Sequence, residues 1–174
     1  MTTTLELHAG PCPLPFSIAL PAAAWFARAC AADRAGAAVE AATCYRHALE
    51  QDPEHVSAHY NLGLLLRREG ALDEAEACFQ AALEIEPTHH KCLMMWGSIC
   101  AARGDWEQAK ELTLAAHELA PEYVKTIQNL IAIHRHLGET GLAARMQRVL
   151  DRVLGQPDAR PARRTARHLS GRLH

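Results

Sequence analysis

The sequence predicts an all-α fold, a right-handed solenoid of stacked antiparallel helix pairs. The first observation is a period of 34 residues, which three residue types keep along most of the chain. The recurring residues are Gly36, Gly70, Gly104 and Gly138; Ala41, Ala75, Ala109 and Ala143; and Pro53, Pro87 and Pro121. The second observation is that apolar residues within each period follow helical spacing. Such repeats bury their apolar faces against neighbouring repeats rather than in one globular centre.

Each recurring residue has a physical role in a frame of two helices, each of about 13 residues. Gly70 is expected to adopt a left-handed conformation that ends the first helix and begins the turn. Ala75 is small enough for the two helices to pack closely, and Pro87 stops the second helix because it lacks an amide hydrogen. The residues expected to fill the space between the helices are Leu62, Gly63, Phe79 and Ala82.

These residues resemble the signature of the tetratricopeptide repeat family, and the chain is similar to small bacterial-type members. The repeat at 56–89 departs from the family motif in two places, with His59 in place of Trp and Leu66 in place of Tyr. The resemblance implies that the first helix of each repeat lines a concave groove that binds a partner polypeptide.

The period divides the chain into six segments. They are a Pro-rich leader (1–21), repeats at 22–55, 56–89 and 90–123, a degenerate fourth repeat (124–157) and an Arg-rich tail (158–174). Arg28 replaces the usual leucine, which suits a terminal repeat with a polar outer face. Ile131 and Leu150 break the frame of the fourth repeat. Its helices are still expected from an apolar stripe of Leu130, Ile133, Leu137, Leu142, Met146, Val149, Leu150 and Val153.

The two ends admit several interpretations. The leader is either a secretory signal, which its prolines and Glu6 disfavour, or a segment whose Leu14, Phe16, Ile18 and Leu20 cover the first repeat. Residues 155–174 carry five Arg and one Asp, so the rest of the chain has a net charge of −6. The tail is interpreted as a contact for an acidic partner, a short capping helix or a solvated end.

Composition and motifs disfavour catalysis. The chain is 49% hydrophobic and 22% charged, and it lacks phosphate-binding glycine loops and nucleophile elbows. Cysteines without CxxC spacing, with Cys44 and Cys78 at one repeat position, indicate core filling in a reducing, cytoplasmic compartment. His89, His90 and Cys92 cluster without a fourth ligand, so no metal or other cofactor is predicted. No apolar run is long enough to span a membrane.

The family resemblance implies that positions 2, 5, 6, 9, 12 and 13 of each repeat face the groove. In repeats 3 and 4 these positions include Ser98, Ala101, Ala102 and Ala132. The predicted partner-binding residues are Phe26, Tyr60, Asn61, Leu64, Arg67, Arg68, Lys91, Met94, Met95, Lys125, Asn129 and Arg135. The apolar residues of this set form a stripe along the groove floor, and the basic residues should attract acidic partners. Asp105 is expected to cap a helix. Glu76 is expected on the outer face, where the substitution Glu76→Lys should do little to partner binding.

The sequence therefore predicts a non-enzymatic adaptor or scaffold that binds a protein or peptide with acidic residues and apolar anchors, whereas nucleic acid is disfavoured. The five-residue clamp of chaperone-binding members is matched only at Asn61 and Lys91, and the asparagine ladder that holds extended peptides only at Asn61 and Asn129. The alternatives are a structural subunit of a larger complex, a chaperone-like protein resembling bacterial secretion chaperones, and a regulatory accessory of an enzyme. The oligomeric state is not predicted.

Overall fold

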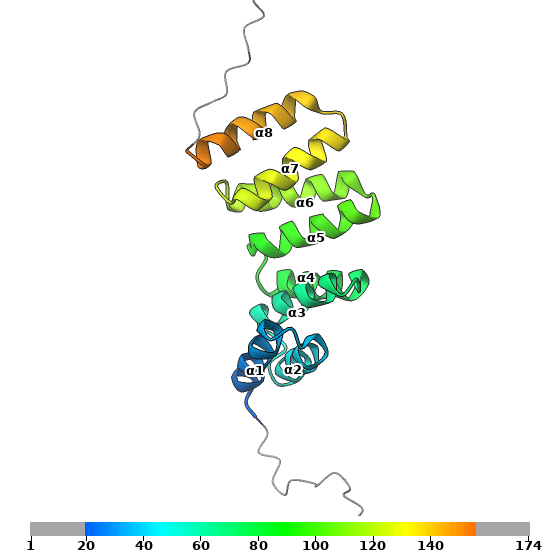
Figure 1. The fold of residues 1–174 in the computed structure, drawn as a ribbon, viewed down its shortest axis with the longest axis vertical. Helices are drawn as coiled ribbons and strands as arrows, with labels where there is room; N and C mark the ends of the chain where they lie inside the picture. The colour runs from blue at the N-terminus through cyan, green and yellow to red at the C-terminus, as the bar shows by residue number, and fades with distance from the viewer. Residues whose placement is uncertain (1–19, 156–174) are drawn as a thin grey trace, which may run out of the picture. The chain divides into compact units, whose positions relative to one another are not determined.

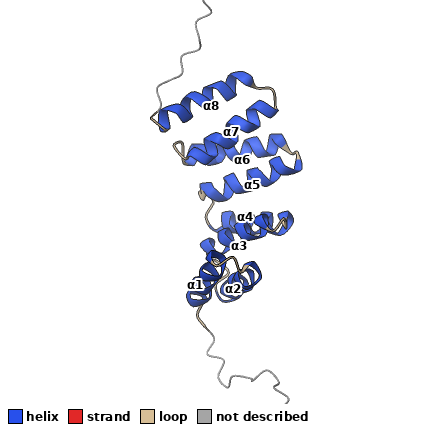
Figure 2. Ribbon diagram, in the orientation of Figure 1, coloured by secondary structure: helices blue, strands red, loops and turns tan. Residues whose placement is uncertain are grey.

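The computed structural model describes residues 20–155, and regular structure among them is entirely helical (Figures 1 and 2). Eight helices follow one another along the described residues. They are α1 (Ala22–Arg34), α2 (Ala38–Gln51), α3 (Val56–Arg68), α4 (Leu72–Ile85), α5 (His90–Arg103), α6 (Trp106–Leu119), α7 (Val124–His136) and α8 (Thr140–Val153). The first helices of the pairs begin at Ala22, Val56, His90 and Val124, and we number each repeat from these residues as position 1.

The chain divides into two compact units, unit 1 (Met1–Pro53) and unit 2 (Glu54–His174). Within unit 1, α1 packs against α2. Unit 2 contains three such pairs, and each second helix contacts the first helix of the next pair. Residues 1–19 of the predicted leader, including Cys12, and the whole predicted tail lie outside the described residues, and the leader residue Leu20 is 39% exposed. No described helix is both long and apolar enough to cross a membrane.

Small residues set the distance between the two helices of a pair. Position 8 is Gly63 in α3, and a Cβ atom built there would lie 2.8 Å from Cε1 of the fully buried Phe79 ring in α4. The same relation holds one repeat later, where a Cβ on Gly97 would lie 2.7 Å from Oγ1 of Thr113. The two helices approach this closely because position 8 has no side chain, which agrees with the role predicted for Gly63.

The turns between paired helices use glycine as predicted. Gly70 has φ +83°, a backbone conformation that an L side chain rarely adopts. Its amide donates to the Arg67 carbonyl and the next amide, of Ala71, donates to the Leu66 carbonyl, so the last carbonyls of α3 are satisfied. The predicted left-handed turn is therefore confirmed.

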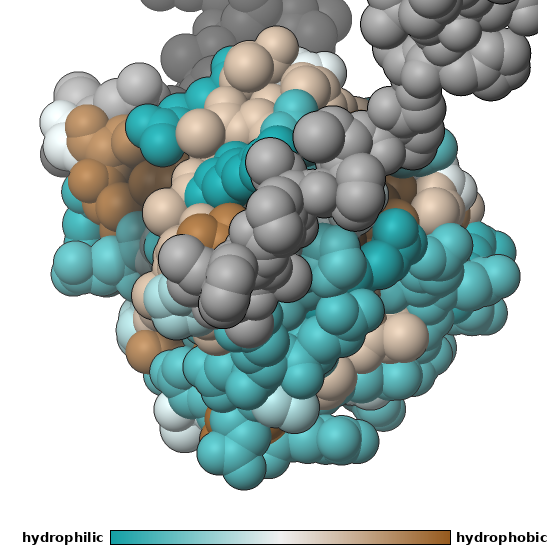
Figure 3. All heavy atoms as spheres, turned by 90° about the horizontal axis from the view of Figure 1, so that it is seen from below, coloured by the Kyte–Doolittle hydropathy of each residue, from teal (hydrophilic) through white to brown (hydrophobic). Residues whose placement is uncertain are grey.

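The face in view in Figure 3 is largely hydrophilic, with apolar side chains scattered over it. Arg28 donates to Glu40 at 2.8 Å, and this ion pair links α1 to α2 on the exposed surface. Trp25 packs beside His47, with ring centroids 4.6 Å apart. The arginine that replaces the usual leucine is thus accommodated by solvent and by a partner carboxylate.

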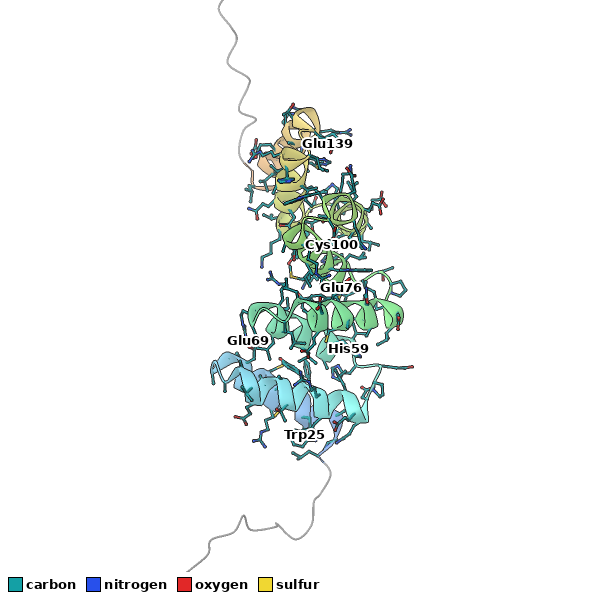
Figure 4. The ribbon with its side chains drawn as sticks, turned by 90° about the vertical axis from the view of Figure 1, so that its right-hand side faces the viewer. Trp25, His59, Glu69, Glu76, Cys100 and Glu139 are labelled. Atoms are coloured by element: carbon teal, nitrogen blue, oxygen red, sulfur yellow. The ribbon has the colours of Figure 1, made fainter. Side chains whose placement is uncertain are left out.

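Glu76 joins two repeats of unit 2, contrary to the outer position predicted for it. Its carboxylate accepts a hydrogen bond of 2.8 Å from the indole nitrogen of Trp96, and it also pairs with the Arg103 guanidinium, so it connects α4 to α5 (Figure 4). The side chain of Glu76 is 20% exposed. The outer placement of Glu76 is therefore corrected, and a lysine there is expected to weaken the contact between the repeats, because it would face Arg103 and leave Trp96 without its acceptor.

A second polar contact joins the last two repeats. Glu139, at the start of α8, accepts 2.6 Å and 3.2 Å hydrogen bonds from His134 in α7 and Lys110 in α6 (Figure 4). Both bonds hold the pKa of the Glu139 carboxyl below its ordinary value, with the His134 contact contributing most. Glu76 and Lys110 share position 21 of their repeats, so this position faces the next repeat along the chain.

The fourth repeat keeps its helices with a changed core. Ile127, Ile131 and Leu150 are buried together, and Met146 and Val149 pack against them. The large Ile131 side chain fits at position 8 because position 24 is Gln147. The side-chain amide of Gln147 donates a 3.0 Å hydrogen bond to the Asp151 carboxylate. The two helices expected from the apolar stripe are present, and Leu142 of that stripe is 44% exposed.

The helix caps differ from the prediction. Asp105 precedes α6, but its side chain makes no capping hydrogen bond. Instead, Nδ1 of His55 accepts from the Ala58 amide at 3.3 Å, and Nδ1 of His89 accepts from the Cys92 amide at 3.2 Å. The imidazoles at the last position of the first two repeats therefore cap helices α3 and α5, a role more often filled by Asp or Ser.

Candidate functional site

An open hollow lies between α5 and α7 of unit 2. Its volume is about 320 Å³. The lining residues are Ser98, Ala101, Ala102, Trp106, Asn129, Ala132 and Ile133. Apolar surface dominates this lining, and Ser98 and Asn129 provide the polar groups. The first helices of neighbouring repeats contact each other, so α3, α5 and α7 form a common surface, which we call the helix-A face of unit 2.

The hollow exists because small residues occupy positions that carry large ones in the preceding repeat. Ala101 and Ala102 stand at positions 12 and 13 of repeat 3, where repeat 2 has Arg67 and Arg68. Position 9 is likewise Ser98 in repeat 3 and Leu64 in repeat 2. Three shortened side chains in one helix leave space that the backbone spacing alone would not create.

The lining residue Trp106 belongs to an aromatic stack. The Trp106 indole at the start of α6 lies against the His136 imidazole at the end of α7, with ring centroids 3.6 Å apart and planes 21° apart. Trp106 is half-buried and also packs against the core that contains Cys100, Ala109 and Ile133. This contact holds the indole in place as a flat apolar wall.

The helix-A face is basic. Helices α3, α5 and α7 contain no Asp or Glu, and their Lys and Arg residues are Arg67, Arg68, Lys91, Arg103, Lys125 and Arg135. Arg103 pairs back to Glu76 and Asp73, whereas Arg67, Arg68, Lys125 and Arg135 are exposed. By contrast, α4 carries four carboxylates and no base. Unit 2 therefore segregates positive charge on its first helices and negative charge on α4.

The structure distributes the predicted partner-binding residues over three environments. The half-buried ones are Phe26, Tyr60, Asn61, Leu64, Lys91, Met95 and Asn129, the exposed ones are Arg67, Arg68, Lys125 and Arg135, and the buried one is Met94. Phe26 belongs to unit 1, and the other predicted residues belong to unit 2. Of this set, only Asn129 lines the hollow.

Met94 is not available to a partner, which corrects its assignment to the groove floor. The side chain is 1% exposed. Position 5 holds a ring in the first two repeats, where Phe26 and Tyr60 lean on the position-24 rings of their own repeats at 5.9 Å and 6.1 Å between centroids. Repeat 3 has the smaller Thr113 at position 24, and we attribute the burial of the flexible methionine to the space thus left.

Sequence reasoning missed Trp106 as a lining residue. It placed Ser98, Ala101, Ala102 and Ala132 on this face without assigning them a role. Their small size was the available signal, because small residues at positions 9, 12 and 13 of successive repeats leave a depression. Trp106 lies in a second helix, so a rule restricted to first helices does not identify it.

The cluster of His89, His90 and Cys92 is structural. His89 caps α5, and its ring packs 5.2 Å from that of Tyr60, while His90 packs 5.1 Å from Tyr123. Burial raises the pKa of the Cys92 thiol to about 12, so the thiolate that a metal requires is disfavoured. Among residues 20–155, no group of His, Cys, Asp and Glu is arranged to hold a metal ion.

No disulfide joins the five described cysteines. Cys44, Cys92 and Cys100 are buried, in agreement with a core-filling role, whereas Cys30 and Cys78 are half-buried. Cys44 and Cys78 therefore share a repeat position but not an environment, and the predicted equivalence holds only in part.

Comparison with known proteins supports the family resemblance over part of the chain. The tetratricopeptide repeat family model matches residues 26–90. These residues are tetratricopeptide repeats. Solved structures extend the likeness to the fold of most of the chain, and they confirm the predicted all-α solenoid of helix pairs. No curated protein matches the chain in sequence.

Three solved tetratricopeptide-like structures illustrate the similarity. MamA 41-end from Desulfovibrio magneticus RS-1 has 20% identity, a TM-score of 0.71, and coverage of 79% of this chain and 78% of that chain. PilF from Pseudomonas aeruginosa has 22% identity, a TM-score of 0.68, and coverage of 76% and 60%. The first tetratricopeptide repeat domain of Spaghetti (RPAP3), bound to the HSP90 peptide SRMEEVD, has 21% identity, a TM-score of 0.66, and coverage of 69% and 95%.

Proposed function

We propose that this chain is a non-catalytic interaction module that binds a partner polypeptide on the helix-A face of unit 2. One observation carries the proposal, namely an open apolar hollow on a surface whose helices bear bases and no acids. Apolar hollows with a few polar groups are the usual form of binding sites. Exposed bases around such a site favour encounter with an acidic partner.

Several observations support a polypeptide as the partner. The four exposed bases of this face project from the surface along which α3, α5 and α7 lie side by side, a geometry suited to an extended chain. The Spaghetti repeat domain of similar fold binds a peptide with three acidic residues, SRMEEVD.

A structural subunit is the second candidate. The observation that favours it is exposed apolar surface on the second helices, where Ile85, Leu114 and Leu119 are 37%, 37% and 44% exposed. A permanent partner on that side would cover these side chains. The two candidates therefore predict contacts on different helices of unit 2.

Site-specific photo-crosslinking distinguishes the two candidates. The photoreactive amino acid p-benzoylphenylalanine is placed at Ala102, which lines the hollow, or at Leu119, which is exposed on α6. Both proteins are irradiated in cells, and the adducts are identified by mass spectrometry. The adaptor proposal expects polypeptide adducts from Ala102 and few from Leu119. One stoichiometric adduct from Leu119, with none from Ala102, would refute it in favour of the subunit.

The location proposed for the protein is a reducing compartment such as the cytoplasm. The support is that no disulfide joins the five described cysteines. Burial inside a helical core protects three of them, whereas the half-buried Cys30 and Cys78 would be more open to oxidation elsewhere.

A further inference from the structure

We propose that the hollow between α5 and α7 receives one bulky apolar side chain of the partner, and that acidic residues flank this side chain in the partner sequence. The inference rests on the proposed function and specifies the partner. It assigns the anchoring role to Ala101, Ala102, Ala132 and Trp106, and the recognition of the flanks to the exposed bases.

The size of the hollow sets the size of the anchor. A volume of about 320 Å³ lies at the lower end of the range of ligand pockets, ~300–1,000 Å³. A single Leu, Met or Phe side chain fits such a space, whereas a folded element does not. The methyl groups of Ala101, Ala102 and Ala132 offer no hydrogen bonds, so a polar side chain placed there would lose its contacts with water without compensation.

The polar groups of the hollow suit a peptide backbone. The Ser98 hydroxyl already donates to the Met95 carbonyl at 2.7 Å, so it is satisfied within α5. The side-chain amide of the half-buried Asn129 carries both donors and an acceptor, which match the carbonyl and amide of one residue of an extended chain. The anchor therefore enters the hollow while the backbone beside it reaches Asn129.

The surrounding charge selects the flanks. Arg135 and Lys125 are exposed on α7, and Arg67 and Arg68 are exposed on α3 of the same face. These two helices and α5 contain no Asp or Glu of their own. The exposed bases attract acidic residues of the partner and repel basic ones, so charge complementarity favours Asp or Glu next to the anchor.

Filling the hollow tests the inference with little risk to the fold. Ala132 is exposed on α7, and Leu is a good helix former, so Ala132→Leu should occupy the hollow without disturbing the helix. The matched control is Ala144→Leu, the same change at an exposed position of α8 away from the hollow. Circular dichroism and thermal unfolding check that both variants fold like the unchanged protein.

The probe is a phage library of random 12-residue peptides, selected on the full-length chain. We expect enriched peptides to contain a bulky apolar residue next to Asp or Glu. Synthetic copies should bind Ala132→Leu at least roughly tenfold more weakly than Ala144→Leu, the loss expected when a central anchor is excluded. Replacing the apolar residue of the peptide with alanine should weaken binding to a similar extent.

Other outcomes overturn the inference, and they differ from failure of the proposed function. Peptides that bind both variants equally, and that depend only on Arg67 and Arg68, would leave the helix-A face as the binding surface but refute the anchor. Peptides that depend on Leu119 instead, or no enrichment at all, would refute both proposals. If sedimentation shows multimers that Ala132→Leu dissociates, the occupant is a second copy of this chain and the stated partner is wrong.

Discussion

Replacing Gly63 with alanine tests the close packing of α3 against α4. The new methyl carbon would start 2.8 Å from Cε1, 3.0 Å from Cζ and 3.1 Å from Cδ1 of Phe79. Phe79 is fully buried, so its ring cannot turn toward solvent to make room. Either the helices must separate or the ring must leave its preferred rotamer, and both weaken the packing of the repeat.

Two opposing effects determine the magnitude. Overpacking of a core costs about 1–3 kcal/mol, whereas replacing glycine with alanine inside a helix stabilises it by about 0.5–1 kcal/mol. The net expectation is a loss of about 1 kcal/mol in unfolding free energy. For a chain of this length, such a loss corresponds to a fall of ~2–4 °C in the melting temperature.

The assay is thermal and urea unfolding followed by circular dichroism, with Gly141→Ala as the control. A Cβ at Gly141, an exposed residue in α8, would meet nothing within 4 Å, so this variant should be unchanged or more stable. Shortening the ring with Phe79→Leu should relieve the clash, giving a favourable coupling of at least ~0.5 kcal/mol in a double-mutant cycle. If Gly63→Ala is as stable as Gly141→Ala, or if the cycle shows no coupling, the packing argument is refuted.

Three further outcomes follow from the contacts described above. Met94→Ala should lower the unfolding free energy by about 2–5 kcal/mol, because it empties a buried site; unchanged urea unfolding would contradict that burial. Glu76→Gln removes the charge that faces Arg103, so it should destabilise unit 2 less at high salt than at low salt. The measurement is the urea concentration at the unfolding midpoint, and a loss that does not depend on salt would argue against the ion pair. The pKa of Glu139 is lowered in the folded protein, so the stabilisation by its carboxylate is present above the ordinary glutamate pKa of about 4.3 and is lost as pH falls through the folded-state value. Glu139→Gln should therefore flatten the acid side of a plot of unfolding free energy against pH. An unchanged acid side would exclude this carboxylate as its source.

Local geometry was predictable from sequence because each repeat imposes it with its own residues. A left-handed turn needs glycine, which identified Gly70, and two helices that nearly touch need a small residue, which identified Gly63 and Ala75. The 34-residue period likewise determined the pairing of helices, since a repeat cannot bury its apolar faces alone.

Contacts between repeats, and the hollow, were decided only by tertiary structure. Position 21 looks like an outer surface within one repeat, yet Glu76 there binds Trp96 of the next repeat. Met94 reads as a groove residue from its position, but its burial depends on the size of the residue packed opposite in the second helix. The hollow requires short side chains on α5 and α7 together with the indole of Trp106 from α6. The shape of the hollow thus depends on the relative sizes of side chains from three helices, and no single repeat position encodes those relative sizes.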